Sequence, residues 1–145
     1  MTDIARLDTS ADRSRFIFGG KAVFTVVSTG TGKRYTFKVT RKPGVVADDF
    51  GGVYFAKVLK GSDNWSNYEY TGVVFGADLD KLVAGRNGKP GEPSHKALAW
   101  LLRNLDSDQV EVWHEGKCGK CGRKLTVPES IETGFGPHCA AEMGG

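Results

Sequence analysis

Cysteine is scarce in this chain of 145 residues, and its three cysteines all lie within the last 28 residues. An odd number of cysteines cannot pair completely as disulfides, and the polar N-terminus does not resemble a secretion signal. The sequence also contains no run of about 18 apolar residues, the length that a membrane-spanning helix needs. We therefore expect a cytoplasmic protein that has no disulfide framework and no membrane contact.

The chain also has little excess of charge of either sign. It contains 20 Lys and Arg and 17 Asp and Glu, for a net charge of +3. This balance excludes a strongly basic protein and leaves only local clusters as evidence for a nucleic-acid partner. Two segments are locally basic. The first contains Lys33, Arg34, Lys38, Arg41 and Lys42, and the second contains Lys117, Lys120, Arg123 and Lys124.

Alternating and β-branched residues predict an antiparallel sheet. The expected strands cover residues 22–29, 34–40, 53–60 and 68–75, with a last short strand at 110–114. Turn-forming residues between the first two strands, and again between the next two, predict two β-hairpins. In the first hairpin, the alternation directs Tyr35, Phe37 and Val39 to one face and Arg34 and Lys38 to the other.

One helix is expected after the Gly/Pro-rich loop at residues 85–93. Leucines recur at helical spacing over residues 94–104, and Ser94 has the chemistry of an N-cap. Residues 1–15 show no apolar period and are expected to form a flexible tail. The fold class is therefore α+β, with a small antiparallel sheet or half-barrel and one packed helix at residues 16–113, followed by a zinc-ribbon-like module at 114–145.

The segment that carries chemistry contains a C-x-x-C pair, Cys118 and Cys121, and then Cys139 on a second glycine-rich turn. Two residues between thiolates form the usual half-site for tetrahedral zinc, and Cys139 supplies a third ligand. For the fourth ligand the candidates are His114 and His138. We favour His114, because His138 adjoins Cys139 and consecutive side chains usually point too far apart to bind one ion.

The string CGKCGRKLTVPESIETGFGPHC, within about residues 114–140, resembles a zinc-ribbon-like domain of unknown function found at the ends of many phage and prophage proteins. The resemblance rests on the paired cysteines, the following Gly-Arg, the Leu-Thr-x-Pro-x-Ser stretch and the Gly-x-Gly-Pro-x-Cys closure. It implies a phage or prophage origin, and with it the cytoplasm of a bacterial host cell. It also implies zinc bound by the three cysteines, and it favours His114. It attaches no activity to the chain.

Function is expected to be binding rather than catalysis, with zinc in a structural role, because no Glu lies where it could activate a metal-bound water. The first hypothesis is a nucleic-acid-binding accessory protein that uses both basic segments and exposed aromatic rings. The aromatic candidates are Tyr35, Phe37, Trp65, Tyr68 and Tyr70, with Trp65 the most notable because it lies in a polar loop. The alternatives are a protein-interaction module that inhibits a host or antiviral-defence factor and, more weakly, a β domain with a small-molecule pocket.

Overall fold

Six antiparallel strands and two helices form the described part of this computed structural model, an α+β arrangement. The structure describes residues 6–41, 53–59, 68–75, 82–83, 91–120, 122, 124–125 and 134–136. The elements are β1 (Arg6–Leu7), α1 (Ser10–Ile17), β2 (Lys21–Ser28), β3 (Arg34–Arg41), β4 (Val53–Leu59), β5 (Tyr68–Phe75), α2 (Pro93–Arg103) and β6 (Val110–His114). Neither helix is long and apolar enough to cross a membrane.

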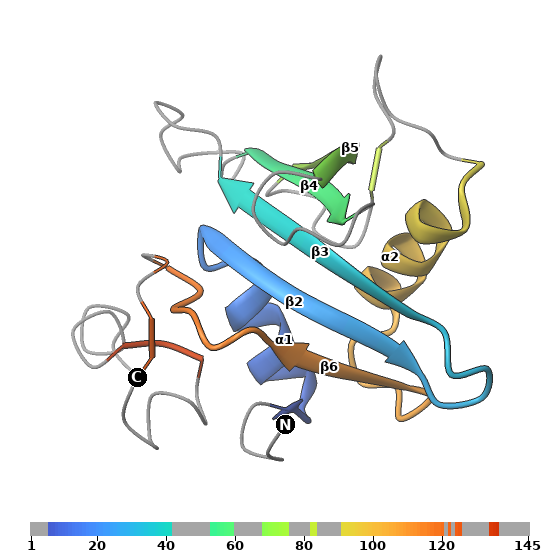
Figure 1. The fold of residues 1–145 in the computed structure, drawn as a ribbon, viewed down its shortest axis with the longest axis horizontal. Coiled ribbons are helices and arrows are strands. Elements are labelled where there is room, and N and C mark those ends of the chain that lie inside the picture. The colour runs from blue at the N-terminus through green and yellow to red at the C-terminus, as the bar shows by residue number, and fades with distance from the viewer. Residues whose placement is uncertain are drawn as a thin grey trace.

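The sheet has the order β1-β6-β2-β3-β4-β5, so the last strand of the chain inserts beside the first long one (Figure 1). All five expected strands are confirmed within one or two residues, and so is the antiparallel pairing of β2 with β3 and of β4 with β5. Gly32 has a φ of 73° in the first hairpin turn, a conformation that glycine adopts without steric cost. Alternation and turn residues thus located the sheet correctly.

The hydrophobic core lies on one face of the sheet, which we call the inner face. Phe24, Phe37 and Val58 project from three strands into the same buried cluster as Phe16 of α1 and Leu98 of α2. Both helices therefore cover the inner face, and Figure 1 shows α1 passing behind β2 and β6. We call the opposite side of the sheet the outer face.

The expected flexible tail and the single helix require correction. Residues 6–7 form β1, which pairs with β6, and residues 10–17 form the second helix, α1. Thr9 caps α1, since its Oγ1 accepts a hydrogen bond of 3.1 Å from the amide of Asp12. The Thr-x-x-Asp spacing is a capping pattern that the absence of an apolar period obscured.

The start of α2 also differs from the expectation. The N-cap is Glu92, without a side-chain capping bond, and Pro93 follows it with the fixed φ that suits the first turn. Ser94 lies inside the helix, where its Oγ is buried without a hydrogen-bond partner. The neighbouring His95 is buried too, and its Nδ1 lies 2.9 Å from the carbonyl oxygen of Thr71 on β5.

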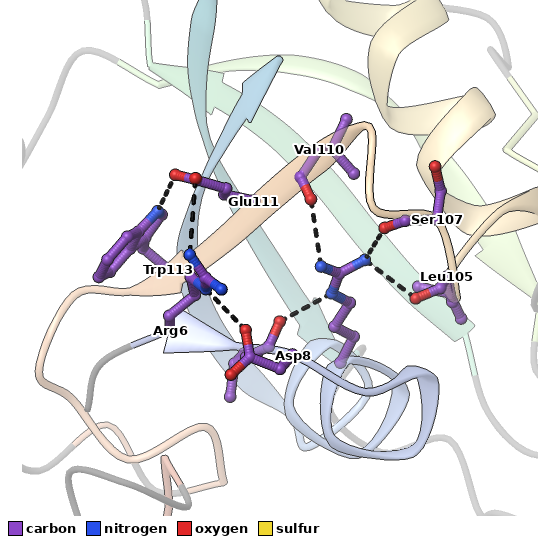
Figure 2. Close-up of polar contacts among 9 residues, drawn as sticks. Arg6, Asp8, Leu105, Ser107, Val110, Glu111 and Trp113 are labelled. Atoms are coloured by element: carbon purple, nitrogen blue, oxygen red, sulfur yellow. Dashed lines mark hydrogen bonds and ion pairs between the residues drawn. The ribbon is translucent and has the colours of Figure 1, made fainter. Parts of the chain in front are cut away.

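Arg13 of α1 is a buried cation that joins the N-terminal elements to the start of β6. It is 3% exposed, and its guanidinium donates to four backbone carbonyl oxygens at 2.8–3.2 Å. Two of these acceptors, Leu105 and Ser107, lie between α2 and β6, and a third, Val110, begins β6 (Figure 2). Burial lowers the pKa of Arg13, which stays protonated because the guanidinium is a very strong base.

Replacing Arg13 with lysine is expected to lower the free energy of unfolding by about 2–4 kcal/mol, because one ammonium group cannot reach all four carbonyls and leaves buried acceptors unsatisfied. Urea unfolding followed by circular dichroism measures the change. Arg15→Lys is the matched control, since Arg15 is exposed on the same helix. Equal stability of the two variants would contradict this role of Arg13.

Candidate functional site

The first half of the predicted metal motif lies in a tight turn, of which the structure describes residues 118–120 and 122, and which we call the cysteine turn. The amide of Lys120 donates to Cys118 Sγ at 3.4 Å, and the amide of Gly122 donates to the Cys118 carbonyl at 2.9 Å. Gly122 has a φ of 79°, which closes the turn in a conformation that favours glycine. An amide directed at sulfur stabilises the thiolate form, the form that binds metal.

Short β pairing flanks the cysteine turn on both sides. Lys117 and Lys124 form an antiparallel bridge, and the amide of Leu125 donates to the carbonyl of Gly116 at 2.8 Å. The turn is also tied to the sheet, because the amide of Lys21 at the start of β2 donates to the carbonyl of Gly119 at 2.8 Å. These bonds hold the turn beside the start of β2 and the end of β6.

The Phe16 ring packs beneath the cysteine turn. It is fully buried, and its centroid lies 5.6 Å from that of His114 and 5.9 Å from that of Phe135. The glycines on the two predicted metal-binding turns meet above it, since the amide of Gly119 donates to the carbonyl of Gly134 at 2.9 Å. The second glycine-rich turn therefore docks directly on the first.

His114 ends β6 and is 1% exposed. Its Nδ1 lies 3.0 Å from the amide of Gly116, which donates to it, so the Nδ1 lone pair points into the loop that leads to Cys118. Metal binding through Nδ1 would replace this hydrogen bond, a cost of about 1 kcal/mol. His114 thus lies at the start of the loop that leads to Cys118.

The outer face carries cations and aromatic rings that alternate with the core residues. Cross-strand pairing aligns Lys38 with Lys57 and Lys57 with Tyr70. Lys38 Nζ lies 5.5 Å from the centre of the Tyr68 ring, and Phe55 and Tyr70 have centroids 6.4 Å apart. Among the described residues, neither helix contributes to this face.

A groove of about 500 Å³ joins the outer face to the cysteine turn. It is lined by Lys21, Lys38, Arg41 and Lys117, together with the Phe55 ring, and we call it the basic groove. Arg41 Nε is buried and has no hydrogen-bond partner in the described structure. The fold has therefore brought the two basic segments of the sequence to one place.

Glu115 interacts electrostatically with two of the predicted cations, Lys117 and Arg34. Burial raises its pKa, whereas the charges of Lys117 and Arg34 lower it. The pKa of Tyr68 is raised by burial and by the charge of Glu115.

At the other edge of the sheet, Arg6 pairs with Asp8 and Glu111 and lies 6.0 Å from the Trp113 ring centre (Figure 2).

The other predicted site residues fall into three groups. Phe37 is fully buried on the inner face and Tyr35 packs against the core from the same side, so neither belongs to the aromatic surface of the outer face. Lys120 and Lys124 lie on or beside the cysteine turn, and Arg34 lies at the hairpin end of β3. Six of the predicted residues lie outside the described part: Lys42, Trp65, Cys121, Arg123, His138 and Cys139.

Three residues of the site were not predicted from the sequence: Lys21, Phe55 and Lys57. Alternation within residues 53–60 contained the information for two of them, because Phe55 and Lys57 have the opposite parity to the buried Tyr54, Ala56 and Val58. Lys21 gave no such indication, since only its pairing with Thr40 places it on the outer face.

Comparison with known proteins concerns the C-terminal segment. Residues 111–144 match a family of unknown function (DUF6011). This match supports a C-terminal domain whose function is unknown, and it includes β6 from Glu111 onward and the cysteine turn. No curated protein and no solved structure matches the chain.

Replacing Gly119 with alanine is expected to lower the free energy of unfolding by about 1–3 kcal/mol through overpacking. A Cβ at Gly119 would lie 2.8 Å from the fully buried Phe16 ring, which has no room to move away. Gly136→Ala is the matched control, because a Cβ there meets nothing within 4 Å. Urea unfolding measures both variants, and equal stability would contradict the close packing of α1 on the cysteine turn.

Proposed function

We propose that this chain is a phage-type accessory protein that binds single-stranded nucleic acid across the outer face, with a structural zinc ion holding the cysteine turn beside it. The observation that carries the proposal is the basic groove, where Lys38 and Arg41 of β3 meet Lys117 of the cysteine segment. Cations from two distant segments converge there around an aromatic ring. The resemblance of residues 114–140 to modules of phage proteins supports the phage context.

Zinc fits the donor chemistry of the cysteine turn. The amide-to-sulfur bond at Cys118, the positive φ of Gly122 and the flanking bridge match what a C-x-x-C half-site needs. We assign Cys118, Cys121 and Cys139 as ligands, with His114 as the fourth. A four-coordinate ion of this kind supplies folding free energy and has no open position for substrate.

Single strands suit the outer face better than duplexes do. Tyr68, Tyr70 and Phe55 present aromatic rings on which unpaired bases can stack, whereas the base faces of a duplex are hidden. Lys38, Lys57 and Lys21 lie among these rings and can neutralise phosphates. A face that combines stacking rings with cations fits nucleic acid better than it fits an apolar partner.

The pairing of Lys38 with Lys57 supports an anionic partner in a second way. Like charges directly opposite one another on neighbouring strands destabilise a sheet. Bound phosphate would relieve this repulsion. Because residues that break a local stability rule tend to serve function, the pair favours a polyanion over a protein partner of mixed charge.

The purified protein is expected to contain about one zinc ion per chain, and Cys118→Ser to contain almost none, because a thiolate ligand is lost. His114→Ala is expected to retain much less zinc than His138→Ala. Elemental analysis of protein purified without added metal measures both. Phe135→Leu controls for lost packing, since Phe135 contacts Phe16 without donating to metal.

Less than about half an equivalent of zinc in the wild type, with no other metal present, would contradict the zinc site. Equal retention in the two histidine variants, or the reverse order, would contradict only the assignment of His114. A loss in Phe135→Leu as large as that in His114→Ala would show that packing, rather than coordination, explains the result.

Charge reversal on the outer face is expected to weaken binding of a fluorescent oligodeoxythymidine strand. Lys38→Glu and Lys57→Glu should each lower the slope of log affinity against log salt by about 0.7, the value for one phosphate contact on a single strand. Tyr70→Ala should cost about 1–3 kcal/mol of binding free energy through lost stacking. Fluorescence anisotropy at several salt concentrations measures these changes.

Two further variants sharpen this test. Arg103→Glu makes the same charge change on an exposed residue of α2, away from the outer face, and should leave the affinity nearly unchanged. Glu115→Gln removes a negative charge beside Lys117 and should tighten binding. Wild-type affinity should likewise rise as the pH falls through the raised pKa of Glu115, because protonation removes the same charge. Absence of binding at low salt would contradict the proposal and favour a protein partner.

A further inference from the structure

A second groove lies on the inner face, at the opposite side of the sheet from the basic groove. It has a volume of about 540 Å³ and is lined by the end of the β2–β3 hairpin and by one side of α2. We call it the α2 groove. Its apolar surface comes from Val26 and Tyr35 on the sheet and from Ala97 and Trp100 on the helix.

The α2 groove exists because two short helices cannot cover six strands. A helix of 11 residues spans roughly 16 Å, and six strands at their usual spacing span roughly 24 Å. α1 packs on β2 and α2 packs on β5, so inner-face residues remain uncovered near the hairpin. Such a gap between packed elements is a common location for small-molecule sites, whose volumes run from about 300 to 1,000 Å³.

Trp100 makes this groove unusual. It leaves 38% of a large aromatic residue exposed, and it lines the groove. Pro93, Lys96, Ala97 and Trp100 follow helical spacing, so the groove-lining stripe of α2 is distinct from the buried stripe that includes Leu98 and Leu101. The sequence thus maintains a second, partly apolar stripe on α2 that contributes little to the core.

The charged side chains that line the α2 groove are all cations. Lys33 and Lys96 both line it, both are exposed, and neither forms an ion pair within the described structure. None of the described lining residues carries a carboxylate. The hydroxyl groups of Ser28 and Thr31 add hydrogen-bonding capacity beside the two ammonium groups.

We infer that the α2 groove binds a small organic anion with an aromatic body, the body against Trp100 and Tyr35 and the anionic group toward Lys33 and Lys96. Aromatic walls favour a flat apolar body, and two uncompensated cations favour a carboxylate, sulfonate or phosphate. This site is separate from the proposed nucleic-acid surface, since Tyr35 projects from β3 on the side opposite Lys38. Its ligand would bind without displacing a strand on the outer face.

The test uses two fluorescent probes of similar shape, the anion 8-anilinonaphthalene-1-sulfonate and its uncharged analogue N-phenyl-1-naphthylamine. The wild-type protein should bind one molecule of the anion saturably, and about tenfold more tightly than the neutral probe, because two cations attract the sulfonate. The double variant Lys33→Ala, Lys96→Ala should abolish that preference without changing the affinity for the neutral probe. Trp100→Ala should weaken binding of both probes.

Phe75→Ala is the matched control, since Phe75 is 43% exposed on β5 and does not line the α2 groove. It should leave both affinities unchanged, and thermal unfolding should show that every variant remains folded, because partly unfolded proteins also bind such probes. Equal binding of the two probes by the wild type, or equal weakening by Phe75→Ala and Trp100→Ala, would overturn the inference.

Competition then distinguishes two sources of the anion. Displacement of the sulfonate probe by adenosine monophosphate would identify a nucleotide, and displacement by naphthalene-2-carboxylate would identify an aromatic acid. Failure of both compounds to compete at millimolar concentration would overturn the assignment to aromatic anions as a class. Since the oligonucleotide variants lie on the outer face, loss of one binding activity leaves the other measurable.

Discussion

The contact of one face of α1 with both ends of β6 is the constraint on which the rest of the structure depends. Arg13 and Phe16 lie one helical turn apart and are both buried. Arg13 binds the carbonyls that precede and begin β6, and Phe16 packs against His114, which ends it. Because β6 is the strand that inserts between β1 and β2, these two side chains position the C-terminal part of the chain against the sheet.

The same contacts determine where the cysteine turn lies. Phe16 supports the turn from below, and the bond from the Lys21 amide to the Gly119 carbonyl ties the turn to the start of β2. This attachment brings Lys117 to the groove formed by Lys38 and Arg41. Under the proposed function, zinc therefore acts at a distance from the nucleic acid, by keeping one cation-bearing segment in register with the sheet.

The two faces of the sheet carry side chains of different chemistry. Side chains of one parity build the core and, where the helices leave a gap, the α2 groove, whereas those of the other parity present Lys38, Lys57 and aromatic rings on the outer face. Arg41 has the parity of the core residues and lines the basic groove at the end of β3. In β3, Lys38 faces outward between Phe37 and Val39, which are buried. A register slip of one residue would exchange these sets, so the core that fixes the register also fixes the candidate binding surface.

Local pattern by itself determined the strands and α2, because alternation, helical spacing and turn residues are properties of neighbouring positions. It did not reveal α1, whose apolar residues are too few to show a period and whose stability comes from the contacts of Arg13 and Phe16. For Phe37, which was also a candidate for base stacking, alternation favoured the core, and the structure confirms that position. Only the tertiary structure decided that Lys38, Arg41 and Lys117 share one groove, because β6 returns to pair with β2 after more than half the chain has intervened, and no local pattern encodes that pairing.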